Sequence, residues 1–277
     1  MAEITAALVK SFRDRTGLPM MECKKALVEA DGDEDLAIEL LRKSGKKTME
    51  KRGGRETEAG RIAVCFDEAT GISSMVELLC ESAPVAGTDE FGQLISQLSA
   101  QLALGPGAKT PEELLAQPVP GNPNRTLQDE YDDLVNRIRE VFKLNRIIRV
   151  ENKCGSYVHH NGGIGVIVEI EGDNTALARD ICMHVASMCP KYVSKDEVDI
   201  ATVAKEKEIL GESVRVENAG KPDNIIEKII EGRLKTFFAE QCLLEQPFVK
   251  DPSKTVGQIA KENGIQVIRM THWILGQ

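Results

Sequence analysis

Residues 61–80 read RIAVCFDEATGISSMVELLC, which is the pattern of a β-hairpin. Apolar residues alternate with others at the start, as in a strand with one buried face. These apolar residues are Ile62, Val64 and Phe66. Residues 68–71 form a turn ending in glycine, and residues 72–80 return as a second strand. A helix is predicted next. Its apolar residues recur at helical spacing and are Phe91, Leu94, Ile95, Leu98 and Leu102.

The same order of elements recurs further along the chain. Residues 147–159 are predicted to be extended, and Asn161-Gly162-Gly163 is a strong hairpin turn. Residues 164–170 then return as a strand, and residues 177–188 have the pattern of a helix. The sequence therefore predicts two small antiparallel sheets, each backed by helices, in an α+β fold.

Two details are shared by the two hairpins. A glycine lies near the first strand of each, Gly60 and Gly155, and a glutamate lies late in each second strand, Glu77 and Glu169. We interpret this as an internal duplication, with chance similarity between two hairpins as the alternative.

The first 44 residues have the pattern of three short helices. Gly17 is suited to end the first helix, and Pro19 is suited to the first turn of the second. Asp33 can cap the third helix, which is expected to stop at Gly45. Helices this short are unstable alone, so we expect them to pack as one bundle.

The remaining segments complete the domain plan. A further helix is expected at 127–142, a tail helix at 253–262 and a last strand at 266–274. Two helices with apolar stripes, joined at Gly220-Lys221-Pro222, predict an antiparallel coiled-coil hairpin. The predicted units are a bundle at 1–45, a basic linker at 46–59, core subdomains at 60–143 and 144–277, and the hairpin inserted at about 197–240.

Composition narrows the class of function. The net charge of −9 disfavours direct nucleic-acid binding, because affinity for phosphates comes largely from basic residues. The 7 cysteines show no disulfide or zinc spacing, which indicates a reducing compartment. We find neither a signal peptide nor an apolar run of the ~20 residues that a membrane helix needs. A cytoplasmic protein without membrane contact is expected.

No sequence motif predicts catalysis. Phosphate-binding loops, nucleophile elbows and zinc-binding helices are all missing, so we expect no enzyme activity, no cofactor and no metal site. Cys182 and His184 lie two residues apart on one predicted helix and would not face each other. His159 and His160, beside a turn, fit either a contact surface or a polar strand end.

An apolar cluster at the first helix-helix turn has two interpretations. Leu18, Met20 and Met21 surround Pro19, and a bundle of this size cannot bury all three side chains. One methionine could fill the core of the bundle. We favour an exposed patch that docks a partner protein, because the flexible methionine side chain suits such surfaces.

Several strings in the chain closely resemble bacterial elongation factor Ts. They run in order from one end of the chain to the other. The strings are residues 2–6 (AEITA), 15–27 (RTGLPMMECKKAL), 30–33 (ADGD), 37–39 (AIE), 183–186 (MHVA), 220–222 (GKP), 231–233 (EGR) and 246–256 (QPFVKDPSKTV).

The resemblance implies a guanine-nucleotide exchange factor that binds elongation factor Tu in its GDP-bound and nucleotide-free states. Members of the family have a ubiquitin-associated-like N-terminal bundle, a two-part core and an inserted coiled coil. The bundle grips the partner's nucleotide domain, the first half of the core disturbs its magnesium site, and the second half contacts its far domain. A homodimer of this chain is left open.

The resemblance also assigns site residues, and one stretch departs from the family. Most members carry Thr-Asp-Phe-Val after the second strand, where this chain has Ser82, Ala83, Pro84 and Val85, followed by Phe91. The family's carboxylate and aromatic ring are therefore missing, although Pro84 should stiffen a protruding loop. The other residues expected to contact the partner are Leu18, Met20, Met21, Phe91, His159 and His184.

Three hypotheses follow from these observations. The first is a working exchange factor with an altered loop at residues 82–85. The second is a protein that binds and stabilises elongation factor Tu with weak or no exchange activity. The third, an enzyme dependent on Cys182, has little support in the sequence.

Overall fold

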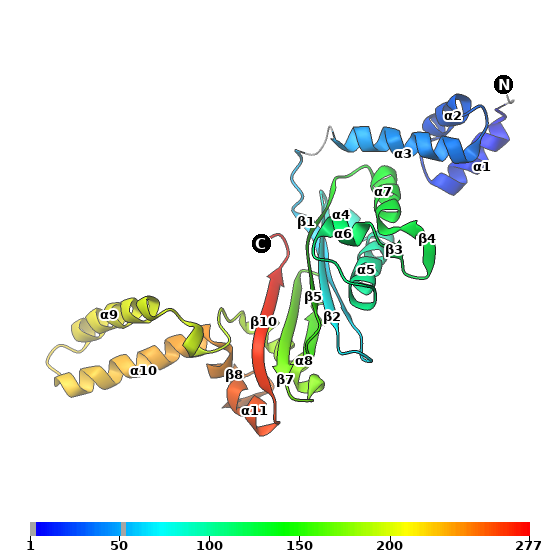
Figure 1. The fold of residues 1–277 in the computed structure, drawn as a ribbon. Coiled ribbons are helices and arrows are strands. Elements are labelled where there is room, and N and C mark those ends of the chain that lie inside the picture. Colours follow the sequence, from blue (N-terminus) through cyan, green and yellow to red (C-terminus); the bar gives the residue numbers. More distant parts are fainter. Residues whose placement is uncertain (1–3, 51–53) are drawn as a thin grey trace.

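A computed structural model of the chain describes residues 4–50 and 54–277. The molecule is elongated (Figure 1). A bundle of three helices lies at one end, a hairpin of two helices projects at the other, and a core of two sheets lies between them. No helix within the described ranges has both the length and the apolar character needed to cross a membrane.

The bundle forms as its capping residues predict. Its helices are α1 (Ala6–Thr16), α2 (Met20–Glu29) and α3 (Glu34–Glu50). Gly17 ends α1 with a left-handed φ of 68°, which glycine adopts without strain. The carboxylate of Asp33 accepts the amide N–H groups of Asp35 and Leu36 and so caps α3. Phe12 and Leu27 fill the interior.

The third helix is longer than predicted. It continues through Gly45 to Glu50, so the first residues of the expected linker at 46–59 are helical. Residues 51–53 of that linker lie outside the described part of the chain. A Cβ atom on Gly45 would lie 1.6 Å from Oδ1 of Asn136 in α7. Glycine leaves room here for the Asn136 side chain, and α3 continues through this position although glycine tends to end helices.

The first half of the core is a three-stranded antiparallel sheet in the order β1-β2-β5. The strands are β1 (Ala59–Phe66), β2 (Ser73–Cys80) and β5 (Phe142–Val150). Between β2 and β5 lie α4 (Ala83–Ala86), α5 (Asp89–Leu104), α6 (Pro111–Leu115), β3 (Pro118–Val119), β4 (Asn122–Thr126) and α7 (Leu127–Ile138). Helices α5 and α7 pack on one face of the sheet and bury Leu98, Phe91 and Leu134.

The second half repeats this plan with the strand order β10-β7-β6. The strands are β6 (Cys154–Val158), β7 (Ile164–Glu171) and β10 (Gln266–Ile274). The other elements are α8 (Thr175–Met188), α9 (Ile200–Glu217), α10 (Asp223–Gln241), β8 (Pro247–Phe248), β9 (Asp251–Thr255) and α11 (Val256–Glu262). Helix α8 covers the outer face of this sheet.

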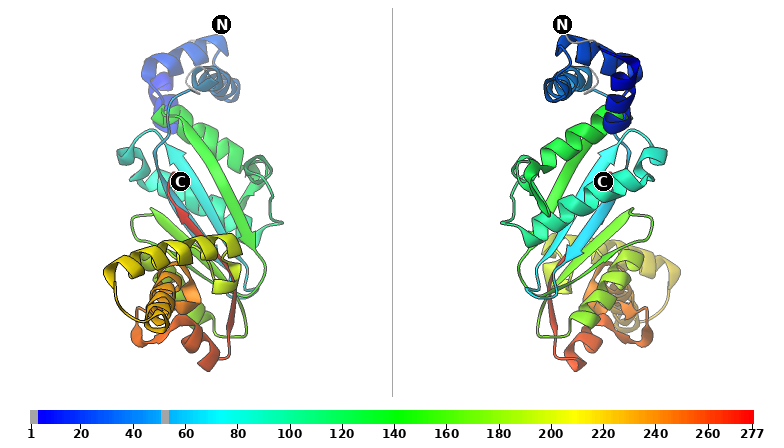
Figure 2. Two further views of the ribbon diagram at one scale, coloured as in Figure 1. Left: turned by 90° about the vertical axis from the view of Figure 1, so that its left-hand side faces the viewer. Right: turned by 90° about the vertical axis from the view of Figure 1, so that its right-hand side faces the viewer.

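The inner faces of the two sheets meet, so helices lie outside and strands inside (Figure 2). The buried residues between the sheets are Ile62, Met75, Val150, Cys154 and Ile167. A Cβ atom on Gly165 would lie 2.5 Å from both Ile62 and Met75, so a glycine permits this close approach. The amide of Ile62 also donates to the carbonyl of Gly162 at 2.7 Å.

The structure extends the internal duplication beyond the two hairpins. Residues 117–127 (QPVPGNPNRTL) and 246–256 (QPFVKDPSKTV) each form a small β pair followed by a helix. The amide of Leu127 donates to Gln117, and the amide of Val256 donates to Gln246 in the same way. Both helices begin with a capping box, at Thr126 and Thr255. Agreement at so many points favours duplication over chance.

The paired glutamates also have equivalent surroundings. Glu77 and Glu169 are buried, and each bonds to an arginine of the neighbouring third strand, Arg146 or Arg269. The β2–β5 and β7–β10 ladders both have a register shift close to these pairs. A buried carboxylate requires such a partner, because desolvation of an unpaired charge is costly.

Two sequence-based boundaries differ from the structure. The helix expected at 127–142 ends at Ile138, because Arg139 adopts a left-handed φ of 66°. The extended stretch expected at 147–159 belongs to two strands, β5 and β6, which lie in different sheets. Residue 150 pairs with Ser73 of β2, so the expected subdomain boundary at 143/144 falls inside a strand of the first sheet.

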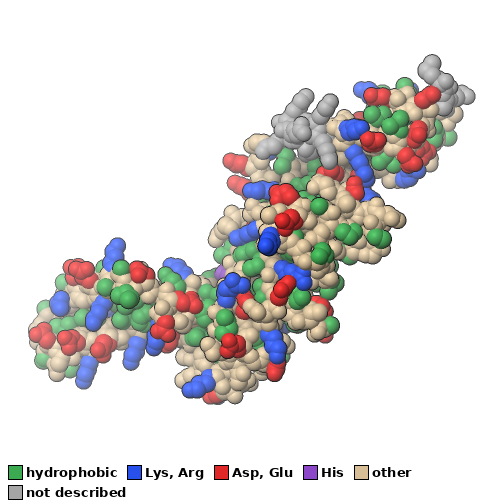
Figure 3. Space-filling model, viewed as in Figure 1, with side chains coloured by type: hydrophobic (Ala, Val, Ile, Leu, Met, Phe, Trp, Pro, Cys, Tyr) green, Lys and Arg blue, Asp and Glu red, His purple; other side chains and the backbone are tan. Residues whose placement is uncertain are grey.

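Helices α9 and α10 form the projecting hairpin, with Pro222 at the N-cap of α10. Its apolar contact is small, with Val214, Ile226 and Ile230 buried between the helices. Acidic and basic side chains are interspersed along it in Figure 3. Coiled-coil packing of this hairpin, and a homodimer, stay predictions.

Candidate functional site: two exposed surfaces near the end of helix α7

The first surface lies on α2. Met20 and Met21 are 47% and 64% exposed, whereas Leu18 packs partly into the bundle core. Met21 also lines a shallow hollow of about 390 Å³ with Lys24, Lys25, Val28 and Glu29. The methionines are therefore available to a partner, and Leu18 supports the turn beneath them.

The α2 surface is larger than predicted. Val28 is 57% exposed and lies seven residues after Met21, which places both on one side of the helix. Lys24 and Lys25 lie between them. The helical spacing of these four residues is a signal that the sequence interpretation did not use. We name Met20, Met21, Lys24, Lys25 and Val28 the α2 face.

The second surface is the turn at residues 82–85, named here the α4 turn. It forms a short helix, α4, with Ala83 and Pro84 exposed and Val85 half-buried. The amide and hydroxyl of Ser82 donate to the two carboxylate oxygens of Glu140, at 3.0 and 2.6 Å. The turn is thus held from below and presents Ala83 and Pro84 to solvent.

Two predicted contact residues lie in the core instead. Phe91 is 0% exposed and packs edge-to-face on Phe142, with ring centroids 5.3 Å apart. His184 is also 0% exposed. Neither side chain has surface to offer a partner, so the expectation of direct contact is corrected for both. Phe91 belongs to the apolar stripe expected of its helix, and the packing of α8 on its sheet buries His184.

The hydrogen bonds of His184 explain its burial. Nε2 lies 2.8 Å from Oε1 of Gln246, and Nδ1 accepts the amide N–H of Val249 at 3.3 Å. This arrangement suits a neutral imidazole with the proton on Nε2. Desolvation accordingly lowers the pKa of His184 below its ordinary value. The residue anchors the turn between β8 and β9.

His159 lies apart from the first two surfaces, in the second half of the core. It is half-buried at the end of β6, with Nδ1 3.0 Å from the hydroxyl of Tyr157. Its ring lies against that of His160, which is exposed. The geometry leaves both earlier interpretations, contact surface and polar strand end, in place.

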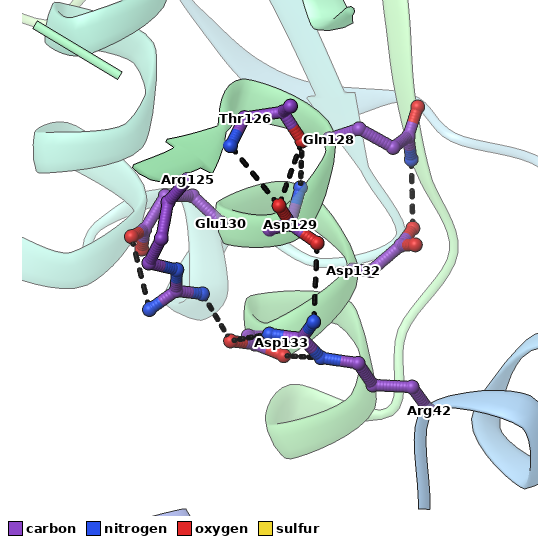
Figure 4. A network of polar contacts seen from close by, with 8 residues as sticks. All are labelled: Arg42, Arg125, Thr126, Gln128, Asp129, Glu130, Asp132 and Asp133. Carbon is purple, nitrogen blue, oxygen red and sulfur yellow. Dashed lines mark hydrogen bonds and ion pairs between the residues drawn. The ribbon is translucent and has the colours of Figure 1, made fainter. Parts of the chain in front are cut away.

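A network of polar side chains joins the three-helix bundle to the core (Figure 4). Arg42 of α3 donates to Asp133 at 3.0 Å and to Asp129 at 3.1 Å, both on α7. Arg125 bonds to the same Asp133 and pairs with Glu130. A cavity of about 500 Å³ lies beside this network between the bundle and α5 and α7. No sequence signal indicated the contacts of Arg42, because they join residues about 90 positions apart.

Two buried cysteines are poorly suited to nucleophilic chemistry. Cys182 is buried, and desolvation raises the pKa of its thiol far above the ordinary value. Burial likewise raises the pKa of Cys80 to about 11. In the described part of the chain, no three His, Cys, Asp or Glu side chains are grouped to hold a metal.

Comparison with known proteins identifies the family. The family model described as Elongation factor TS matches residues 84–277. Elongation factor Ts of Alkalilimnicola ehrlichii is 43% identical over 277 residues, covering 99% of this chain and 92% of that protein. The proteins of the same name from Methylococcus capsulatus and Thioalkalivibrio sulfidiphilus are 39% and 38% identical, with the same coverage of both chains. This chain belongs to the elongation factor Ts family.

Proposed function

We propose that this chain is a guanine-nucleotide exchange factor of protein synthesis. It binds elongation factor Tu in its GDP-bound form and promotes GDP release, so that GTP can bind. Membership of the elongation factor Ts family over nearly the whole chain supports this role. In the structure, the supporting observation is that the α2 face and the α4 turn are both exposed and are both tied to the segment that follows α7. Arg139 bonds to α2 at Glu22, and Glu140 bonds to the α4 turn at Ser82.

The α2 face would bind the partner first. Its methionines and Val28 offer flexible apolar area, and Lys24 and Lys25 add positive charge beside it. Such a surface fits a partner helix with apolar and acidic side chains. We expect this contact to supply affinity, while the α4 turn alters the nucleotide site.

Exchange follows from differential binding. A protein that binds nucleotide-free Tu more tightly than Tu·GDP must weaken GDP binding by the same factor. Each ~1.4 kcal/mol of difference is worth tenfold. Magnesium is the largest local charge that holds the diphosphate, so a turn that displaces its ligands speeds release. Ala83 and Pro84 bring no carboxylate and no aromatic ring, so the α4 turn would act by its shape.

Stopped-flow fluorescence tests this proposal. Release of a fluorescent GDP analogue from cognate Tu is measured at saturating exchange factor, with the wild type and with Ala83→Asp/Pro84→Phe. We expect acceleration by the wild type and a further increase in the variant. A matched control places the same residues at the exposed start of β4 as Asn122→Asp/Pro123→Phe, which should leave the rate unchanged. Unaccelerated release with the wild type would reject the proposal.

A second function is favoured by the same departure at Ala83 and Pro84. Without the family's carboxylate and ring, the chain could bind and stabilise Tu with weak or no exchange. Titration calorimetry with nucleotide-free Tu separates the two functions. Tight binding combined with unchanged GDP release would establish the stabiliser, whereas tight binding with accelerated release would establish the exchange factor.

A further inference from the structure

Three consecutive residues after α7 bond to α2 beside the α2 face, and to the chain at and next to the α4 turn. The guanidinium of Arg139 bonds to Glu22, which directly follows Met21 of the α2 face. The carboxylate of Glu140 accepts the amide and hydroxyl of Ser82 in the α4 turn. The amide of Val141 donates to Glu81 at 2.8 Å, one residue before that turn. Two surfaces about 60 residues apart in sequence are thus connected through one short segment, residues 139–141.

The backbone of this segment explains how it reaches both sides. Arg139 has a left-handed φ of 66°, which ends α7 and turns the chain abruptly into β5. Non-glycine residues adopt this conformation rarely, and it persists where surrounding contacts hold it. The neighbouring side chains of Arg139 and Glu140 therefore bond to different elements, Arg139 to α2 and Glu140 to the α4 turn.

We propose that Arg139, Glu140 and Val141 form a clasp that fixes the α4 turn relative to the α2 face. These are positioning residues: the clasp sets the orientation of two surfaces that must engage one partner together. The inference rests on the proposed exchange function for its consequence, but the clasp itself is a property of the free protein.

Glu140 is the stronger half of the clasp. Ser82 is the N-cap of α4, but its hydroxyl accepts no amide N–H of that helix and donates to Glu140. Both carboxylate oxygens are used, and hydrogen bonds to a charged acceptor are stronger than neutral ones. Glu81 adds a second tie, since it also pairs with Arg55 at 2.8 Å. The turn therefore depends on Glu140 for its position.

Arg139 is the weaker half, and other contacts assist it. Its side chain and that of Glu22 are 41% and 44% exposed, so solvent screens the pair. Arg42 bonds to Asp129 and Asp133 of the same α7 and holds the bundle nearby. Loss of Arg139 should therefore loosen the α2 face without releasing the bundle.

Hydrogen–deuterium exchange on the full chain alone tests the clasp. In Glu140→Ala, amides of residues 82–87 should exchange roughly tenfold faster, the effect expected for loss of charge-assisted hydrogen bonds. Glu140→Gln keeps one acceptor oxygen and should give an intermediate increase. The matched control is Glu151→Ala, an exposed glutamate beyond the far end of β5. Unchanged exchange at 82–87 in Glu140→Ala would overturn the assignment.

Exchange kinetics with Tu test the consequence. Met21→Ala and Pro84→Gly should each slow GDP release, and in the wild-type background their effects should not multiply, because a rigid clasp couples the surfaces. In the Glu140→Ala background the two effects should become multiplicative. Effects that already multiply in the wild-type background would overturn the coupling.

The two experiments fail separately. If the wild type does not accelerate GDP release, the proposed function fails, while faster amide exchange in Glu140→Ala would still establish the clasp. If the wild type accelerates release and Glu140→Ala matches it in maximal rate and in half-saturating concentration, the clasp has no positioning role. Thermal unfolding of each variant, compared with Glu151→Ala, shows whether a loss of activity comes from misfolding.

Discussion

At the scale of single residues, the two halves of the core use different side chains for one task. Gln101 donates to Oε1 of Gln117 at 3.1 Å in the first half. In the second half His184 bonds to Oε1 of the equivalent Gln246. Glutamine has no charge to gain at low pH, whereas histidine does. The duplication therefore suggests a substitution that removes one titrating group without removing its hydrogen bond.

We predict that His184 makes stability depend on pH. Burial lowers its pKa in the folded state, so below the ordinary value near 6.5 the unfolded chain binds more protons. The free energy of unfolding should thus fall as pH drops below ~6.5, by up to about 1.4 kcal/mol per pH unit until the folded pKa is reached.

Urea unfolding of the wild type and His184→Gln between pH 5 and pH 7.5, at about 0.5-unit steps, measures this dependence. The variant should show a smaller slope. His272→Gln is the matched comparison, because burial also lowers the pKa of His272. Equal slopes in the wild type and in His184→Gln would contradict the prediction.

Two glycines should respond oppositely to alanine. A Cβ atom on Gly155 would lie 2.3 Å from the backbone of Ala178 in α8, and backbone cannot move aside as a side chain can. Gly155→Ala should destabilise the protein by about 2 kcal/mol or more. Gly232 lies within α10 with nothing within 4 Å, so Gly232→Ala should stabilise its helix by up to about 1 kcal/mol. Thermal unfolding measures both changes, and a stable Gly155→Ala would show that the sheet and helix can separate.

At the scale of elements, the β2–β5 pair depends on one buried ion pair. Glu77 bonds to Asn145 and Arg146 of β5 and also accepts the amide of Gly276 at 3.1 Å. Arg146 in turn lies over the ring of Trp273, 4.5 Å from its centroid. Strands of the first sheet and the end of the second are thereby joined through a single carboxylate.

Replacement of Arg146 should reveal the cost of an unpaired buried charge. Arg146→Met is expected to destabilise the protein by about 3–5 kcal/mol, because Glu77 remains buried. The double variant Glu77→Gln/Arg146→Met should recover part of this loss. Arg269→Met is the matched change in the second sheet and should cost less, since the Arg269 side chain is 61% exposed. Urea unfolding gives all three values, and a double variant less stable than Arg146→Met would refute the argument.

At the scale of the whole molecule, stability is expected to be uneven. The two sheets bury apolar side chains on both faces, against helices outside and against each other inside. The α9–α10 hairpin projects from this core and buries few residues of its own (Figure 1). Local opening is governed by such differences in buried contact.

Hydrogen–deuterium exchange should therefore rank the parts of the molecule. Amides in the middle of α9 and α10 are expected to exchange through local opening, faster than those of β2 and β7, which open only with the core. A matched variant, Ile230→Ala, should speed exchange in the hairpin and leave β2 unchanged. Equal protection of hairpin and sheets would show that the molecule unfolds as one unit.

Much of the candidate site could be found from the sequence, because its signals are local. The left-handed turn at Gly17 and the start of α2 at Pro19 place Met20 and Met21 on a short amphipathic helix. The stretch at residues 82–85 was found through its departure from the family pattern. Phe91 was assigned both to the apolar stripe of its helix and to the partner contacts, and its full burial agrees only with the first. His184 was also expected to contact the partner, because helical spacing shows which residues share a face and not what covers that face.

The sequence by itself determined the type and order of most of the longer elements, but not the short elements α4, α6, β3, β4, β8 and β9. Caps at Gly17 and Asp33, the glycine turn after β6 and the alternation at residues 61–66 act within a few residues, so the local chain suffices to specify them. Only the tertiary structure decided that α3 continues past Gly45, that residues 142–150 join the first sheet, and that Glu140 holds Ser82. These outcomes depend on groups that the chain brings together from distant positions, where packing and charge pairing outweigh local preference.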